Sequence, residues 1–274
     1  MWDLLKAVVL GALQGLTEFL PISSSAHLRI FPELFGWGDP GAAFTAVIQI
    51  GTELAVLIYF RHDIWRIGST WLKSLRHPEY RGQLDARMGW FIIIGSLPIV
   101  ILGIWLKDTI EEDFRNLWII GTTLIVLGLI LGVADRMSSS SKVIRDIRLR
   151  DAVLMGLAQA AALVPGVSRS GATISMGRFL GYEREAATRY AFLLAIPAVV
   201  GAGLFELKEI PHGDNSYGWG PTIVATVVAF VIGYAAIAWL LRYVSTRSYL
   251  PFVLYRVGLG SMTLVLVAAG VLNA

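Results

Sequence analysis

Six apolar stretches, each long enough to cross a lipid bilayer, restrict the folds open to this sequence. A membrane-spanning helix needs about 20 predominantly apolar residues. The chain of 274 residues is 55% hydrophobic and only 16% charged, which leaves too little polar surface to cover a water-soluble globule. We therefore expect an all-α integral membrane protein. The six predicted spans cover about residues 43–60, 88–106, 117–134, 187–205, 220–241 and 250–272.

Two further apolar stretches are interrupted and do not suit a straight span. The first carries Glu18 and stops at Pro21, and the second is broken at Pro165. Proline ends or kinks a helix because it lacks the backbone N–H. We expect each stretch to enter the membrane and turn back, over residues 4–40 and 151–181.

The two interrupted stretches resemble one another when residues 7–25 are laid over residues 152–170. Each is also followed by three predicted spans. This pattern predicts two related halves, residues 1–137 and 151–274, joined by a cytoplasmic linker at 138–150. At this offset of 145, the identical pairs are Ala7 and Ala152, Val8 and Val153, Gly11 and Gly156, Gln14 and Gln159, Ser23 and Ser168, and Ser25 and Ser170.

Basic residues in short loops indicate which span ends face the cytoplasm. Six Lys and Arg residues lie in the 61–87 loop and five in 136–150, whereas acidic residues predominate in 107–115 and 206–219. This assignment places both termini outside and turns the second half upside down relative to the first. The predicted fold is therefore an inverted repeat of two halves, each with one re-entrant broken helical segment and three transmembrane helices.

The chain contains no cysteine, which excludes disulfide scaffolds, thiol nucleophiles and cysteine-ligated metal centres. An attacking group must then be an oxygen, a nitrogen or an activated water molecule. The small net charge of +3 comes with basic loops that orient the spans, so we expect no nucleic-acid partner.

Polar residues at membrane depth gather first around Glu18, where a charge costs about 2.5–3.5 kcal/mol unless it is paired or hydrated. Gln14 and Glu18 lie four residues apart on one helix face, where they can bind a hard cation or anchor a water molecule. His27 follows Ser24 by three residues and is placed to act as a base or an acid toward its hydroxyl. The hydroxyls after the break belong to Ser23, Ser24 and Ser25.

A second polar cluster follows the break at Pro165 and Gly166. Small residues let backbone N–H groups approach an anion at the start of the next helix. Arg169 adds a fork of donors that matches phosphate oxygens, although it could instead pair with Glu18 to hold the halves together. Ser168, Ser170 and Thr173 supply further hydroxyl donors.

Three other polar residues at membrane depth have open roles. Gln49 and Glu53 either extend the polar pocket or pair with a neighbouring helix. Arg256 either contacts a phosphate or snorkels to the cytoplasmic face, and we favour snorkelling.

The two clusters resemble the signature motifs of the undecaprenyl-diphosphate phosphatase family, the bacitracin-resistance type. The first runs from Gln14 through Glu18 to Phe-Leu-Pro-Ile-Ser-Ser, and the second is Pro165-Gly-Val-Ser-Arg-Ser-Gly-Ala-Thr173. The resemblance covers essentially the whole chain. Gln14 stands where many members have glutamate, and Ala26 where many have glycine.

The resemblance implies an enzyme of the bacterial plasma membrane that converts undecaprenyl diphosphate to undecaprenyl phosphate, recycling the lipid carrier of cell-wall synthesis. It implies a divalent cation, Mg²⁺ or Ca²⁺, bound by Glu18 and Gln14. The catalytic residues would be Ser24, His27, Glu18 and Arg169, and the phosphate would be held by Ser23, Ser25, Ser168, Arg169, Ser170 and Thr173. We expect the active site to open outward, and the partners to be the bilayer, the polyprenyl diphosphate and a possible second copy of the chain.

Two other classes of function compete with this interpretation. Inverted repeats with broken helices are common in secondary transporters, and a lipid flippase can share the same architecture. An intramembrane serine protease could use Ser24 and His27, but Arg169 among hydroxyls suits a phosphate better than a peptide. Whether Ser24 attacks covalently or a metal-activated water attacks directly stays open.

Overall fold

A computed structural model describes residues 2–106, 116–209 and 215–273, and this part of the chain is helical with no strand. Short 3₁₀ turns lie at Pro78–Tyr80, Ile144–Asp146 and Ala161–Leu163. The α-helices are α1 (Trp2–Phe19), α2 (Ser24–Leu34), α3 (Ala42–Tyr59), α4 (Arg61–Arg76), α5 (Leu84–Trp105), α7 (Leu117–Met137), α8 (Leu149–Ala160), α9 (Arg169–Phe179), α10 (Arg184–Glu209), α11 (Trp219–Val244) and α12 (Leu250–Ala268).

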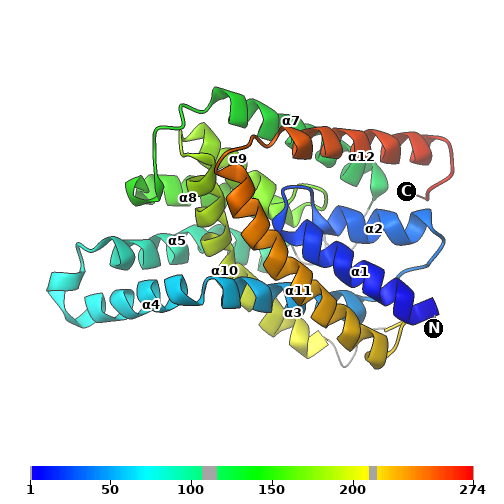
Figure 1. The fold of residues 1–274 in the computed structure, drawn as a ribbon, viewed down its shortest axis with the longest axis horizontal. Helices are drawn as coiled ribbons and strands as arrows, with labels where there is room; N and C mark the ends of the chain where they lie inside the picture. The colour runs from blue at the N-terminus through cyan, green and yellow to red at the C-terminus, as the bar shows by residue number, and fades with distance from the viewer. Residues whose placement is uncertain (1, 107–115, 210–214, 274) are drawn as a thin grey trace.

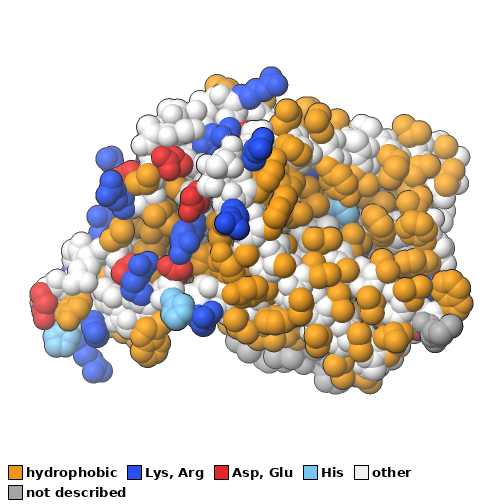
Figure 2. All heavy atoms as spheres, viewed as in Figure 1, with side chains coloured by type: hydrophobic (Ala, Val, Ile, Leu, Met, Phe, Trp, Pro, Cys, Tyr) orange, Lys and Arg blue, Asp and Glu red, His pale blue; other side chains and the backbone are white. Residues whose placement is uncertain are grey.

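Five helices are long and apolar enough to cross a membrane, namely α5, α7, α10, α11 and α12. A sixth span exists only if α3 and α4, which meet at a bend of 69°, are counted together. The expected all-helical, multi-pass class is therefore confirmed. Figure 2 agrees with it, because hydrophobic side chains cover most of the visible face over α1, α11 and α12.

The prediction of a loop over residues 61–87 is wrong for its first part, which forms α4. Asp63 in the first turn and Arg76 in the last turn suit the helix dipole. The apolar side of α4 packs against α5, where the rings of Trp71 and Trp90 lie 5.5 Å apart. The basic residues concealed this apolar face in the sequence.

Small residues let the helices approach closely. A Cβ atom at Gly11 of α1 would overlap the carbonyl oxygen of Ala225 in α11. A Cβ atom at Gly156 of α8 would likewise overlap the carbonyl oxygen of Gly95 in α5. Close backbone contact through glycine is how helices commonly associate in membranes. The opening helix of each interrupted stretch thus packs against a span from the other part of the chain (Figure 1).

Both interrupted stretches break at the expected places, and the breaks lie against each other. The first separates α1 from α2 at Leu20 to Ser23, and the second separates α8 from α9. The backbone N–H of Gly166 donates to Ser25 Oγ at 3.4 Å, and Ser170 Oγ donates to the Leu20 carbonyl at 3.1 Å.

Arg256 binds the two breaks together from α12. Its guanidinium donates to the carbonyls of Pro21 at 3.2 Å and Gly166 at 2.9 Å. Further donations reach Val167 and, in α7, Thr123 and Leu124. Because Arg256 is fully buried among these carbonyls, the preference for snorkelling is wrong. Unpaired backbone carbonyls at this depth are costlier than the burial of a guanidinium that pairs them.

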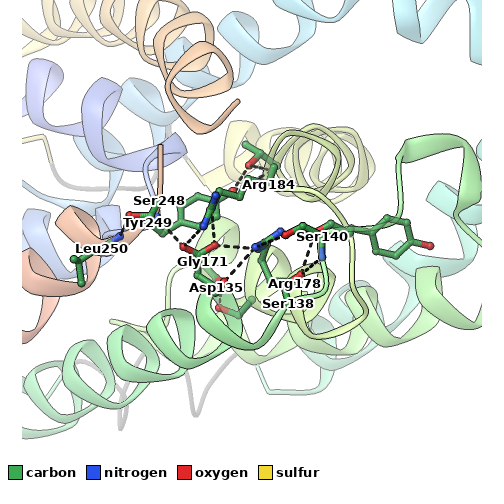
Figure 3. A network of polar contacts seen from close by, with 12 residues as sticks. Asp135, Ser138, Ser140, Gly171, Arg178, Arg184, Ser248, Tyr249 and Leu250 are labelled. Atoms are coloured by element: carbon green, nitrogen blue, oxygen red, sulfur yellow. Dashed lines mark hydrogen bonds and ion pairs between the residues drawn. The ribbon is translucent and has the colours of Figure 1, made fainter. Parts of the chain in front are cut away.

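Asp135 at the end of α7 connects three other helices (Figure 3). Its carboxylate accepts from Arg178 Nε of α9 at 3.0 Å and from Arg184 Nε of α10 at 2.8 Å. The backbone N–H of Tyr249, just before α12, donates to the same carboxylate at 3.2 Å. Arg178 and Arg184 thus serve as structural partners of a buried acid.

The 107–115 loop, which we assign to the outer side, lies outside the described residues, as does part of the 206–219 loop.

Gly156→Ala should lower the unfolding free energy by about 1–3 kcal/mol, the usual cost of overpacking. The control is Gly258→Ala, because a Cβ atom there meets nothing within 4 Å. Thermal unfolding in detergent compares the two variants. Equal melting temperatures would contradict the close approach of α8 to α5.

Arg256→Met should destabilise the protein by several kcal/mol, since each buried carbonyl left without a donor costs about 1–3 kcal/mol. Exposed Arg247 supplies the control, Arg247→Met. The same melting assay measures both. A melting temperature unchanged by Arg256→Met would mean that this guanidinium does not hold the breaks.

Candidate active site

Two serines in a strained backbone conformation prepare the site. Ser23 has φ of 74° and Ser168 has φ of 69°, in the left-handed region that non-glycine residues rarely adopt. Each caps the helix that follows it, with Ser23 Oγ accepting from Ala26 N at 3.4 Å and Ser168 Oγ from Gly171 N at 3.2 Å. Helices α2 and α9 therefore both begin directly after a strained serine, at the place where the two breaks meet.

The helices that these serines cap, α2 and α9, are both 11 residues long. Their first residues are Ser24 and Arg169, which hold the same position 145 residues apart. The same backbone turn thus presents a hydroxyl in one case and a guanidinium in the other.

Glu18 joins these two residues. Its Oε2 accepts from Ser24 Oγ at 2.6 Å and from Gln14 Nε2 at 3.2 Å. Its Oε1 accepts from Arg169 Nη2 in an ion pair. The structure therefore brings together Gln14, Glu18, Ser24 and Arg169, as the sequence predicted, around a carboxylate placed to take the serine proton.

His27 is buried and does not hydrogen-bond with Ser24. Its Nδ1 lies 2.6 Å from the Ser23 carbonyl, and its Nε2 lies 2.6 Å from the Tyr255 hydroxyl. A carbonyl only accepts, so Nδ1 carries the proton of the neutral ring and Nε2 accepts from Tyr255. The ring also stacks on Tyr255, with centroids 5.5 Å apart. Both ring nitrogens are thus already hydrogen-bonded, Nδ1 to the strained turn at Ser23 and Nε2 to Tyr255. Glu18, rather than His27, hydrogen-bonds with the Ser24 hydroxyl.

A cavity of about 200 Å³ opens beside these residues. Ser24, Ser25, Gln14 and Gln49 line it from the polar clusters. Ser168, Ser170 and Thr173 are buried away from it, and Thr173 Oγ1 donates within α9 to the Arg169 carbonyl at 2.9 Å. The rest of the lining is Leu28, Arg29, Pro32, Glu33, Gly38, Asp39, Pro40, Thr45, Ile120 and Pro165.

Some site residues were not found from the sequence. Thr52 accepts a hydrogen bond of 3.4 Å from Gln14 Nε2. Arg29 lines the cavity in an ion pair with Glu33 at 3.2 Å. The spacing of four residues between Arg29 and Glu33 is typical of an ion pair on a helix. Nothing in the sequence, however, indicated that this pair lies at a cavity.

The donor set around Glu18 fits a hard divalent cation. The described residues contain no group of three or more His, Cys, Asp or Glu side chains arranged for a metal. Gln14 Oε1 is an amide oxygen that is buried without a hydrogen-bond partner in the described structure, so it can add to the oxygens of Glu18. Carboxylate and amide oxygens are the ligands that Mg²⁺ and Ca²⁺ take.

Comparison with known proteins agrees with the geometry. A family model described as bacitracin resistance protein BacA matches residues 7–262. An undecaprenyl-diphosphatase from Nocardioides sp. strain JS614 is 80% identical over the full length of both chains. Undecaprenyl-diphosphatase 2 of Frankia casuarinae is 61% identical and that of Streptomyces coelicolor 56%, each over 98% of this chain and 96% of the relative. The chain therefore belongs to the bacitracin resistance protein family of undecaprenyl-diphosphate phosphatases.

Proposed function

We propose that the protein is a membrane phosphatase that hydrolyses undecaprenyl diphosphate to undecaprenyl phosphate and inorganic phosphate. The main support is the environment of the Glu18 carboxylate. It accepts a hydrogen bond of 2.6 Å from the Ser24 hydroxyl and also forms an ion pair with Arg169. A hydroxyl, a base and a guanidinium at one point are the parts that phosphoryl transfer needs. The activity of the relatives, as named, supports the same substrate.

In the proposed reaction, Ser24 Oγ attacks the terminal phosphorus and gives its proton to Glu18. The bond from that phosphorus to the bridging oxygen breaks, and undecaprenyl phosphate leaves with the electron pair. Arg169 has five N–H donors, so it can hold phosphate oxygens while Nη2 stays near Glu18. Glu18 then loses the Ser24 proton to solvent. Water attacks the phosphorus of the phosphoserine and gives a proton to Glu18, the bond from phosphorus to Ser24 Oγ breaks, and Glu18 returns the proton to Ser24 Oγ as phosphate leaves.

The remaining predicted residues support this step from around it. Ser25 is exposed to the cavity and is the hydroxyl best placed to contact the phosphate. His27 is a positioning residue in this scheme, because it binds the Ser23 carbonyl. Four other hydroxyls keep the N-termini of α2 and α9 directed at the anion. Ser23 and Ser168 cap these helices, Ser170 donates to the Leu20 carbonyl, and Thr173 donates within α9.

A divalent cation, Mg²⁺ or Ca²⁺, would be held by Glu18 and the free amide oxygen of Gln14. When bound, it would neutralise charge that builds on the phosphate oxygens.

The proposed architecture is an inverted repeat of residues 1–137 and 151–274, with α1–α2 and α8–α9 as re-entrant segments. The matching lengths of α2 and α9, and the paired packing of Gly11 and Gly156, support it. A homodimer stays a prediction.

The proposed orientation places both termini and the cavity outside. Lys and Arg gather at the end of the molecule opposite both termini, which supports a cytoplasmic position for that end (Figures 1 and 2). Asn273, next to the C-terminus, donates to the cavity residue Glu33 at 3.2 Å, so the cavity lies on the terminal side.

Ser24→Ala, Glu18→Gln and Arg169→Lys should each lower phosphate release from undecaprenyl diphosphate by about 10²–10⁴-fold, the range for loss of acid–base or electrostatic catalysis. The matched control is Ser245→Ala, an exposed serine at the end of α11. Purified protein in detergent with matched melting temperatures is required. Normal turnover in any of the three variants removes that residue from the reaction.

Chelation should abolish phosphate release, and Mg²⁺ or Ca²⁺ should restore it. A 32P-labelled phosphoserine at Ser24, trapped by acid quench, would support covalent attack. Its absence with full turnover would favour direct attack by water. A protein that releases no phosphate but moves the lipid across vesicles would instead be a transporter or flippase on the same architecture.

A further inference from the structure

Glu53 is a buried carboxylate that the proposed reaction does not use. It lies on α3 and is only 8% exposed. Among the described residues, its one side-chain donor is Gln49 Nε2, at the long distance of 3.4 Å. A carboxylate at membrane depth is expensive unless a partner or a ligand offsets its charge.

The fold reserves space for this carboxylate. A Cβ atom at Gly203 of α10 would overlap Glu53 Oε2, so the carboxylate would have to move if a larger residue stood there. The surroundings of the Glu53 carboxylate are therefore fixed by two helices. The α10 backbone at Gly203 carries no side chain that would fill the space, and Gln49 lies one turn away on α3.

Glu53 is connected to the site around Glu18. Its neighbour Thr52 accepts from Gln14 Nε2, which also donates to Glu18. Gln49 lines the same cavity as Gln14 and Ser24.

Two equivalent pairs thus lie on neighbouring helices. Gln14 donates to Glu18 on α1, and Gln49 donates to Glu53 on α3, each across four residues. Gln14 Oε1 is also buried and has no hydrogen-bond partner in the described structure, so it adds a free oxygen to the α1 pair.

Glu53 has no cation beside it within the described residues. Arg169 pairs with Glu18. Arg256 donates to backbone carbonyls rather than to either carboxylate. A divalent cation would supply the missing partner of Glu53, and oxygen ligands favour Mg²⁺ or Ca²⁺.

We infer that Glu53 is the second carboxylate of the divalent-cation site, on the α3 side, opposite Glu18 and Gln14 on α1. This inference rests on the proposed function only for the role of the cation in phosphate release. The cation site itself is inferred from Glu18, Gln14 and Glu53. Gln14 contributes a neutral oxygen, and Glu53 supplies the negative charge that a second carboxylate on α1 would otherwise provide.

Glu53→Gln should weaken cation binding by about 10- to 100-fold. Binding is measured with full-length, metal-stripped protein in detergent and without lipid, by titrating Mn²⁺ and following free Mn²⁺ by electron paramagnetic resonance. Glu79→Gln, which removes an exposed carboxylate far along the chain, is the control and should bind like wild type. Equal affinity in Glu53→Gln and wild type, or no Mn²⁺ binding by wild type, overturns the inference.

A second variant covers the case in which Glu53→Gln does not fold. Gly203→Ala should displace the Glu53 carboxylate and weaken Mn²⁺ binding, whereas adding it to Glu53→Ala should change the affinity no further. Equal additional loss in both backgrounds would contradict a role through Glu53. Because no lipid is present, these results stand apart from phosphatase activity: a wild-type protein that binds Mn²⁺ but releases no phosphate refutes only the proposed function.

Discussion

The hydrogen bonds from Arg256 to the carbonyls of both breaks make the rest of the site feasible. A helix that stops within a bilayer leaves backbone groups that water cannot reach, so the protein must supply their partners. One guanidinium from α12 serves Pro21 in the first break and Gly166 and Val167 in the second. The breaks are thereby fixed against each other, and the residues they carry meet in one place.

Once the breaks are fixed, short-range chemistry defines the site. Glu18 ends α1 and reaches both Ser24 at the start of α2 and Arg169 at the start of α9. Each of these residues follows a strained serine, which directs a helix start toward the same carboxylate. Asp135, near the C-terminus of α7, likewise accepts hydrogen bonds from several elements. Its donors come from α9, α10 and the start of α12. Two carboxylates, the partly buried Glu18 and the buried Asp135, are thus each shared among several helices.

Much of this arrangement was predictable from the sequence because its signals are local. Apolar runs of about 20 residues predict spans, prolines predict breaks, and the Gln14–Glu18 spacing predicts one polar helix face. The contact of Glu18 with Arg169 was also weighed, from charge alone. What could not be predicted depends on partners far along the chain: Tyr255 binds His27 across 228 residues, and Arg256 reaches Pro21 across 235. The α4 helix was missed for a different reason. Its many basic residues favoured a loop, whereas one side of the helix is apolar and packs against α5.

The positional identity of Ser24 and Arg169 has a consequence for the chemistry of the site. Both are the first residue of an 11-residue helix after a left-handed serine, yet one is a hydroxyl and the other a cation. Two copies of the first stretch would place two hydroxyls beside the carboxylates and no guanidinium. Two copies of the second would lack the carboxylate as well, because Leu163 stands 145 residues after Glu18. A change that made the two stretches alike at this position would therefore remove either the hydroxyl or the guanidinium from the carboxylate.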